Sequence, residues 1–228
     1  MEDLTEERPK CLVELSGKSL LELQLLALRE AGIHEIAVVT GYKSELLRDY
    51  QLTEFHNPRW QQTNMVSSLE FAKEWLEAGP CIVSYSDIFY ETAAVNLLIG
   101  SSAPLAITYD PCWLELWKKR FGDPLIDAET FKLNPDGTLA EIGEKPDSAE
   151  QVEGQYMGLL RFSTHGWAKV MELRSALNPD EKDSMDMTTM LRKVMKEGSF
   201  PVQALPIEGS WGEIDSKKDL HLYDGKSI

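Results

Sequence analysis

Apolar residues in the first half of the chain follow two spacings, one typical of helices and one typical of buried strands. Between Leu20 and Ala31, leucines recur on one broad helical face, with Ser19 placed to cap the helix and Gly32 to end it. Continuous apolar runs predict buried strands at residues 35–40, 81–87 and 105–109. Because helical segments separate these runs, we expect a mostly parallel sheet covered by helices.

The pattern changes after Asp110. Two short strands, at 129–133 and 139–142, flank the turn sequence Asn134-Pro135-Asp136-Gly137 and predict a hairpin. Further strands are expected at 156–162, 202–205 and 211–214. The order predicts one α/β domain over residues 1–228. It has a Rossmann-like, mostly parallel mixed sheet with flanking helices and a smaller antiparallel half.

Composition and charge limit the kinds of partner that the protein is expected to bind. The chain has 228 residues and a formal net charge of −15, which repels nucleic acid and anionic membranes. We find no apolar run near the roughly 18 residues needed to span a bilayer, and the acidic start is unlike a signal peptide. Three cysteines without metal-ligand spacing (Cys11, Cys81 and Cys112) favour a reduced, cytoplasmic protein.

Asp87 ends the buried run CIVSYSD and is the first candidate for chemistry. A carboxylate at the end of a buried strand is costly unless something pairs with it. In open α/β sheets, ligands bind at the carboxyl ends of the strands. Asp87 is therefore a candidate metal ligand or catalytic acid, and a helix-capping or turn role is the alternative.

Glu213 and Asp215 form a second candidate site. They alternate along a predicted strand, so both side chains point to one face while Ile214 faces the core. Two carboxylates on one face repel each other unless a cation joins them. The alternative is a helix cap at Asp215 or Ser216.

Two lysines also stand in suggestive places. Pro9 predicts an extended turn that presents Lys10 just before a strand, where its ammonium could reach a phosphate as a point charge. A solvated lysine is the alternative. Lys145 lies in Glu144-Lys145-Pro146, which is by itself a common surface tripeptide.

In order, these segments resemble the nucleotidyltransferases of the glycosyltransferase-A-like fold, whose fold is nucleotide-diphospho-sugar transferase-like. Within that family, the chain is similar to the phosphocholine, 2-aminoethylphosphonate and phosphoglutamine cytidylyltransferases. The matching segments are TEERPKCLVEL, AGIHEIAVVTGYK, NPRWQQTNMVSSLEFA, SYSDIFY, LWKKRFGDPLIDAET, EGQYMGLLRF and SWGEIDSKKDL. The resemblance implies Mg²⁺-dependent transfer of a nucleotidyl group from CTP to a small phosphate or phosphonate, with release of pyrophosphate.

The resemblance also implies roles for single residues. Lys10 would bind phosphates and be catalytic, while Asp87 and Asp215 would hold Mg²⁺ with Glu213 close by. Residues near the nucleotide would be Gly41, Tyr42, Asn64 and Ser67, and Lys145 would face the acceptor. Residues 1–110 would then mainly bind the nucleotide, and residues 111–228 would mainly bind the acceptor and metal.

The aromatic and basic segment 112–121 is a candidate acceptor site. Arg120 suits bidentate contact with a phosphate, and Trp113 or Trp117 could hold an ammonium group by cation–π attraction. Core packing beside a solvated basic turn is the alternative. The acceptor is left open, and so is the oligomeric state, a homodimer included.

One departure from the family is visible. The family begins with a strand and a glycine-rich loop of the type L-A-A-G-x-G-S-R, and Met1 falls where the residue after that arginine would stand. That loop would wrap the phosphates with backbone N–H groups. Without its strand, two neighbouring strands would each lack a ladder partner.

Two other function classes stay open. A nucleotide-sugar glycosyltransferase of this fold usually carries Asp-x-Asp at the strand end, whereas Tyr85-Ser86-Asp87 lacks the first acid. The missing loop would also fit a non-catalytic nucleotide-binding protein.

Overall fold

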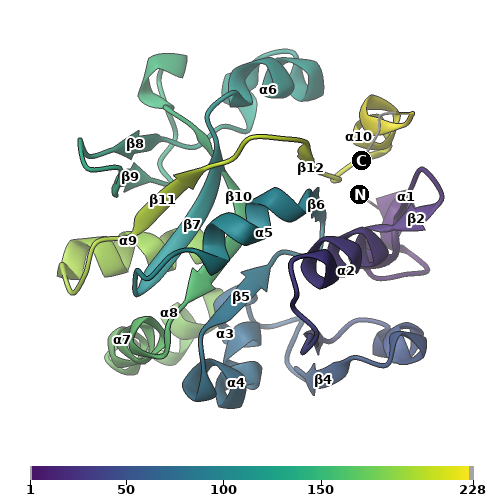
Figure 1. Cartoon of the computed structure of the whole chain (residues 1–228), viewed down its shortest axis with the longest axis horizontal. Coiled ribbons are helices and arrows are strands. Elements are labelled where there is room, and N and C mark those ends of the chain that lie inside the picture. The colour runs from purple at the N-terminus through teal and green to yellow at the C-terminus, as the bar shows by residue number, and fades with distance from the viewer. Residues whose placement is uncertain (1, 226–228) are drawn as a thin grey trace.

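The computed structural model describes residues 2–225 and is built around a four-stranded sheet in the order β11-β7-β10-β5 (Figure 1). The strands are β5 (Cys81–Ser84), β7 (Leu105–Asp110), β10 (Gln155–Phe162) and β11 (Gln203–Pro206). β10 is antiparallel to both β5 and β7, and β11 is parallel to β7. Three strands therefore share one direction and β10 opposes them, so the predicted mixed sheet is confirmed, with its antiparallel strand in the middle.

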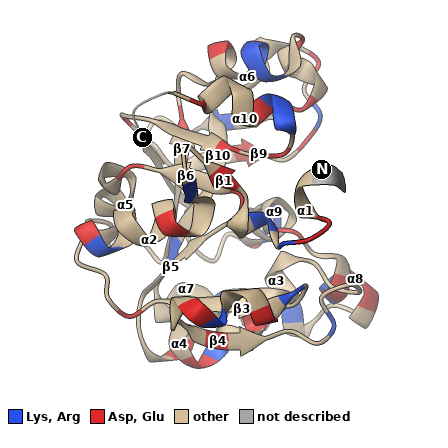
Figure 2. Cartoon of the chain, turned by 90° about the vertical axis from the view of Figure 1, so that its right-hand side faces the viewer, with Lys and Arg blue, Asp and Glu red and all other residues tan. Residues whose placement is uncertain are grey.

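The other strands form pairs. They are β1 (Glu14–Leu15) with β2 (Lys18–Ser19), β3 (Ala37–Thr40) with β4 (Thr53–His56), β6 (Ile88–Tyr90) with β12 (Trp211–Glu213), and β8 (Phe131–Leu133) with β9 (Leu139–Ile142). Only β3 and β4 are parallel among these. Within residues 2–225, β5 pairs with β10 alone and β3 with β4 alone. Figure 2 shows this separation of the β3–β4 pair from the four-stranded sheet from the side.

Helices flank the sheet. They are α1 (Glu2–Thr5), α2 (Leu20–Glu30), α3 (Met65–Leu69), α4 (Lys73–Ala78), α5 (Thr92–Ile99), α6 (Trp113–Phe121), α7 (Thr164–Ser175), α8 (Pro179–Ser184), α9 (Met187–Glu197) and α10 (Lys217–Tyr223). Short 3₁₀ segments are η1 (Lys10–Leu12), η2 (Ser44–Tyr50), η3 (Glu70–Ala72), η4 (Pro124–Ile126) and η5 (Ala149–Gln151). In Figures 1 and 2, α2 and α5 cover one face of the sheet and α9 lies on the opposite side.

The predicted start and end of the long N-terminal helix are confirmed in α2. Ser19 and Glu22 form a reciprocal capping box at its start, each side chain bonding the other's backbone N–H. Gly32 follows its last turn with φ +86°, a conformation that costs glycine little. Before the helix, Ser16 and Gly17 both have positive φ and close the tight turn between β1 and β2.

The aromatic and basic segment after Asp110 forms helix α6 rather than an open basic turn. Trp113 and Trp117 are four residues apart and so lie on one face, where both are buried. Arg120 falls on the same face and is also buried. Hydrophobic packing therefore determines which of the basic side chains turns inward.

The main hydrophobic core takes side chains from both halves of the chain. β10, from the second half, lies between β5 and β7 of the first half. The boundary near residue 110 thus does not separate two sheets, and the division of binding roles between the halves stays a prediction.

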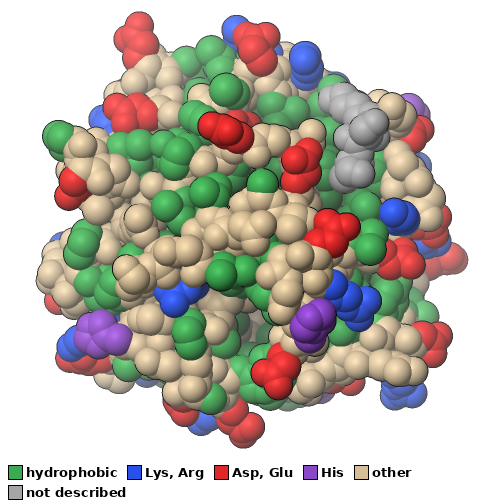
Figure 3. Space-filling view, viewed as in Figure 1, with side chains coloured by type: hydrophobic (Ala, Val, Ile, Leu, Met, Phe, Trp, Pro, Cys, Tyr) green, Lys and Arg blue, Asp and Glu red, His purple; other side chains and the backbone are tan. Residues whose placement is uncertain are grey.

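The surface carries both signs of charge. On the face drawn in Figure 3, acidic and basic side chains are interspersed among apolar and neutral ones. None of the helices within the described residues combines the length and apolar character that crossing a bilayer requires.

Candidate active site

Asp87 lies in the turn between β5 and β6, and its backbone is held from two sides. Gln24, a buried residue of α2, donates from Nε2 to the carbonyl oxygens of Tyr85 (2.9 Å) and Ile88 (2.6 Å). The backbone N–H of Ile214 donates to the Asp87 carbonyl at 2.9 Å. These bonds fix the turn, so the position of the Asp87 carboxylate is set by α2 and by the segment after β12.

Glu213 and Asp215 reach the same place because β12 pairs with β6. Glu213 is opposite Ile88 in this antiparallel ladder, and Ile214 is fully buried. The predicted alternation is confirmed: one carboxylate oxygen from each of Asp87, Glu213 and Asp215 lies within 4.8 Å of the others. Ser216 caps α10, so the cap alternative applies to that serine and leaves Asp215 for the cluster.

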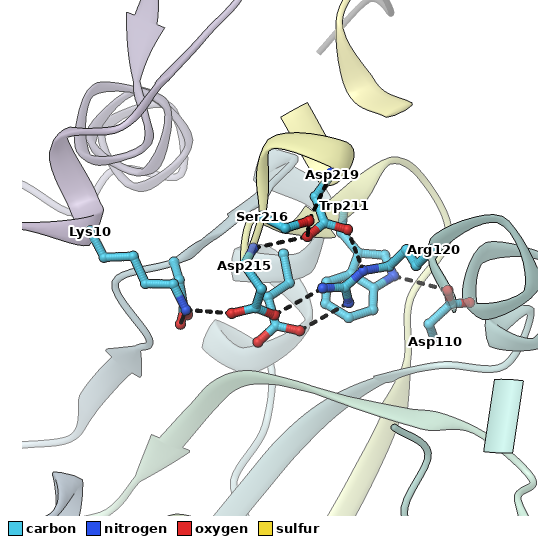
Figure 4. A network of polar contacts seen from close by, with 9 residues as sticks. Lys10, Asp110, Arg120, Trp211, Asp215, Ser216 and Asp219 are labelled. Atoms are coloured by element: carbon cyan, nitrogen blue, oxygen red, sulfur yellow. Dashed lines mark hydrogen bonds and ion pairs between the residues drawn. The ribbon is translucent and has the colours of Figure 1, made fainter. Parts of the chain in front are cut away.

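Lys10 completes the group from the other end of the chain (Figure 4). It begins η1 instead of ending an extended turn, with Pro9 as the extended cap before it. Its neighbour Cys11 is buried and anchors this turn in a small core. The Lys10 ammonium lies 2.5 Å from Asp87 Oδ2 and 2.6 Å from Asp215 Oδ1, so the solvated-lysine alternative is wrong for this structure.

Arg120 approaches the cluster from α6. Its side chain has no exposed surface and bonds Asp219 (2.9 Å), Glu213 (3.0 Å) and Asp215 (2.9 Å). Its guanidinium carbon lies 5.0 Å from the centre of the Trp117 ring, within cation–π range. Each of the three guanidinium nitrogens donates to a carboxylate, from Nε to Asp219 of α10 and from the other two to Glu213 and Asp215.

The acceptor contact predicted for Trp113, Trp117 and Arg120 needs an open face, and this structure encloses all three side chains. Trp113 is 3% exposed and donates its indole N–H to the Val152 carbonyl at 3.0 Å. Trp117 is 1% exposed. Packing, the alternative interpretation, fits the two tryptophans, while Arg120 contributes its charge to the acidic cluster.

The electrostatics of the cluster show a shortage of positive charge. Burial raises the pKa of Glu213 to about 7, and repulsion by Asp215 and Asp87 adds to this. For Asp215, burial would raise the pKa, but hydrogen bonds and attraction to Lys10 and Arg120 bring it below the usual value. Burial would lower the pKa of Lys10, but Asp87 and Asp215 more than offset this and raise it.

The cluster fits a divalent metal. Its donors are all carboxylate oxygens, the ligands preferred by Mg²⁺ and Ca²⁺. Asp87 Oδ1 is buried and has no hydrogen-bond partner within residues 2–225. A buried oxygen without a partner and a glutamate with a raised pKa are both stabilised by a nearby cation. Asp87, Glu213 and Asp215 are therefore the residues that would hold the metal.

Comparison with known proteins identifies the family to which the chain belongs. Residues 5–128 match the family described as the MobA-like NTP transferase domain. The chain belongs to the MobA-like NTP transferase family. Members of this family are nucleotidyltransferases. This activity agrees with the acidic cluster and the lysine that meet beside β6 and β12. The glycosyltransferase alternative is therefore not needed to explain the site.

Individual relatives of this NTP transferase support the assignment. The chain is 36% identical over 235 residues to the CTP:phosphoglutamine cytidylyltransferase of Campylobacter jejuni, covering 96% of this chain and 92% of the relative. It is 29% identical over 124 residues to the choline-phosphate cytidylyltransferase of Streptococcus pneumoniae, covering 53% of each. The solved structure of the inositol-1-phosphate CTP transferase from T. maritima has a TM-score of 0.75 over 98% of this chain and 88% of the other, at 16% identity, and confirms the fold.

The transferase's predicted nucleotide residues near β3 have clear structural roles. Gly41 lies against Trp60 so closely that an added Cβ would be 2.5 Å from the tryptophan Cβ. The Tyr42 hydroxyl donates to the Glu6 carbonyl at 2.6 Å, and its ring centre is 5.4 Å from that of Trp60. Packing explains the glycine, and nucleotide contact at both positions stays a prediction.

Asn64 and Ser67 join α3 to α8 in this transferase. The Asn64 side chain accepts from the Met65 N–H at 2.7 Å, which caps α3, and it donates to the Ser184 carbonyl at 3.2 Å. Ser67 Oγ donates to the Lys182 carbonyl at 2.7 Å. Nucleotide contact by these two residues also stays a prediction.

Lys145, the predicted acceptor residue, lies outside the acidic cluster. Its ammonium donates to the carbonyls of Leu125 and Ile126, the latter at 2.8 Å, at the end of η4. Its acceptor role stays a prediction.

Sequence reasoning missed Gln24 and Asp219, which support the acidic cluster, and Arg174, which supports Ser67. Gln24 interrupts the leucine face of α2, and this polar residue on an apolar stripe was the available signal. Asp219 bonds Arg120, the Ser216 hydroxyl and the Asp215 N–H; the spacing Ser216-x-x-Asp219 is a capping signal. The buried Arg174, which bonds Ser67, Glu70 and the Lys182 carbonyl, had no comparable local signal.

A separate surface hollow of about 310 Å³ lies on α2. Its lining residues are Lys18, Glu22, Leu25, Leu26, Arg29 and Tyr50. It includes no member of the acidic cluster, and its two basic and one acidic side chains are exposed surface groups of α2 and β2.

Proposed function

We propose that this protein is a Mg²⁺-dependent cytidylyltransferase that transfers CMP from CTP to a small phosphorylated or phosphonate acceptor and releases pyrophosphate. The observation that carries this proposal is the convergence of Lys10, Asp87 and Asp215. The two aspartates bond the same ammonium although 77 and 205 residues separate them from it in sequence. The choice of CTP and of a phosphorylated acceptor is supported by the printed names of the Campylobacter jejuni and Streptococcus pneumoniae relatives.

The reaction is an in-line displacement at phosphorus. An ionised phosphate oxygen of the acceptor forms a bond to the α-phosphorus of CTP. The bond to the bridging oxygen breaks, and pyrophosphate leaves with the electron pair. The attacking oxygen carries no proton near neutral pH, so the reaction requires no general base.

The residues of the chain supply charge at the reacting phosphates and hold the reacting groups in position. When bound, Mg²⁺ neutralises negative charge on the reacting phosphates. Asp87, Glu213 and Asp215 would hold the ion. Lys10 supplies a positive charge that can reach the α-phosphate, where a preorganised charge stabilises the transition state. Arg120 fixes the carboxylates of Glu213 and Asp215 from behind.

Location and assembly complete the proposal. All three cysteines are free, which supports a reduced, cytoplasmic environment. The net charge of −15 disfavours nucleic acid as a partner. The cluster is built from a single chain, so a homodimer is compatible with the proposed function but not needed for it.

The test is a substrate panel. The purified protein is incubated with Mg²⁺, one of the four nucleoside triphosphates and one acceptor from phosphocholine, phosphoethanolamine, aminoethylphosphonate and phosphorylated amino acids, and pyrophosphate is measured. We expect release that requires both CTP and an acceptor. Release from another nucleotide would overturn the choice of CTP, and sugar transfer from a nucleotide sugar without pyrophosphate would favour the glycosyltransferase.

A further inference from the structure

We propose that Lys10 holds the metal's place in the nucleotide-free protein and gives it up when the metal–nucleotide complex binds. Lys10 would then have two alternating partners, the carboxylates of the cluster and the phosphates of the nucleotide. This inference rests on the proposed function, because it assumes that the acidic cluster is the metal site.

The geometry of Lys10 is the first support. Its ammonium lies 2.5 Å from Asp87 Oδ2 and 2.6 Å from Asp215 Oδ1, so it bridges two of the three carboxylates that would hold the metal. A divalent ion placed between the same carboxylates would meet the ammonium at close range, where like charges repel strongly. The two cations therefore compete for this place.

Lys10 and Arg120 differ in how easily their side chains can move away from the carboxylates of the acidic cluster. The Arg120 side chain has no exposed surface, is bonded to three carboxylates and lies against Trp117. The Lys10 side chain is 19% exposed and is a compact charge on a flexible stem. Arg120 is thus a permanent part of the cluster, whereas Lys10 is exchangeable.

A count of charges supports the exchange. Asp87, Glu213, Asp215 and Asp219 supply four negative charges when ionised, and Lys10 and Arg120 supply two positive ones. These groups sum to minus two, and with Lys10 gone and one divalent ion bound they sum to minus one, so the exchange leaves the cluster less negative than before.

The exchange predicts coupled binding. The metal alone must displace Lys10 without giving it a new partner, so metal binding is weak. A bound nucleotide offers phosphates to the displaced ammonium, so it strengthens metal binding. By reciprocity the metal strengthens nucleotide binding by the same factor.

The experiment measures Mn²⁺ binding by the loss of the free-ion electron paramagnetic resonance signal, with and without a non-hydrolysable CTP analogue. Each series is compared with the same samples without protein, because the phosphates of the analogue bind Mn²⁺ themselves. Without nucleotide, Lys10→Met should bind Mn²⁺ at least about tenfold more tightly than wild type, because a competing charge is gone. With the analogue present, the variant should lose most of this advantage and bind the analogue more weakly. Lys10→Arg keeps the charge and should resemble wild type, and Lys18→Met, at an exposed lysine of β2, is the matched control.

Two failures can be told apart. If wild type binds no Mn²⁺ even with the analogue, the proposed metal site is wrong. If wild type binds Mn²⁺ with the analogue but nucleotide-free Lys10→Met binds it no more tightly than wild type, the exchange is wrong and the metal site stands. If Lys10→Met does not fold, mass-spectrometric labelling of wild-type lysines decides: Mn²⁺ should raise Lys10 labelling specifically, and unchanged labelling would overturn the exchange.

Discussion

At the scale of single residues, the site depends on groups whose ionisation is set by their neighbours. Asp215 keeps a lowered pKa because two cations contact it, whereas Glu213 is buried beside two carboxylates. Two carboxylates within a few ångströms of each other therefore have pKa shifts of opposite direction. Burial prevails over the single cation at Glu213, whereas two cations outweigh burial at Asp215.

Glu213 gives a pH dependence with a definite sign. Its pKa is about 7 in the folded protein against 4.5 for a free side chain. Between these values the folded state holds a proton that the unfolded state has lost, so stability falls as pH rises. The slope is at most about 1.4 kcal/mol per pH unit. In chelator, urea unfolding of Glu213→Gln should lack this contribution, so the variant gains stability over wild type from pH 5 to pH 8.

The comparison of the two unfolding series isolates Glu213, because most other titrating groups are common to both proteins. A constant difference in unfolding free energy across this pH range would show that Glu213 is ionised throughout. The electrostatic description of the cluster would then be incorrect.

At the scale of secondary-structure elements, α6 and the β5–β6 turn link the hydrophobic core to the acidic cluster. The tryptophans of α6 direct Arg120 inward, and Gln24 of α2 fixes the turn that carries Asp87. Both elements join residues that are buried to residues of the acidic cluster. A change in packing at α6 should therefore reach the site through Arg120.

We therefore expect Arg120 to contribute to the stability of the fold and to metal binding more than to acceptor binding. Arg120→Met leaves the buried Asp219 and its neighbours without their cation, a loss of about 3–5 kcal/mol in similar cases, and should also weaken Mn²⁺ binding. Arg120→Lys should recover part of both. Chemical denaturation, Mn²⁺ titration and the Michaelis constants for both substrates provide the measurement, with the exposed Lys119→Met as the matched control.

An opposite pattern would restore the acceptor interpretation. That pattern is an Arg120→Lys protein with wild-type stability and Mn²⁺ affinity and a raised Michaelis constant for the acceptor alone. The guanidinium would then have to leave its three carboxylates during the reaction.

At the scale of the whole molecule, the sequence predicted local patterns well and long-range placement less well. Asp87 at a strand end and the alternation of Glu213 and Asp215 are readable from a few residues. The position of β10 between β5 and β7 is not, because helix–strand alternation does not specify an antiparallel strand in the middle. The pairing of Arg120 with Asp219, 99 residues apart, likewise required the fold.

The resemblance extended the local patterns to a family, and the comparisons confirm it over most of the chain. The acceptor role predicted for the segment after Asp110 stays a prediction, and the packing of that segment weighs against it. A run of basic and aromatic residues was interpreted as a binding surface, although the four-residue spacing of Trp113 and Trp117 was typical of a buried helical face. Charge on a helix has to be interpreted together with the face on which it falls.

The most direct test of the account is the Mg²⁺ dependence of pyrophosphate release from CTP in Asp87→Asn and Asp215→Asn. Each variant removes one carboxylate of the cluster while keeping its shape. We expect turnover to fall by at least about 100-fold in both, the scale for a lost electrostatic group, with no recovery at high Mg²⁺. Asp136→Asn, in an exposed turn, should behave as wild type. Wild-type rates with unchanged Mg²⁺ dependence in both variants would contradict the assignment of this cluster as the metal site.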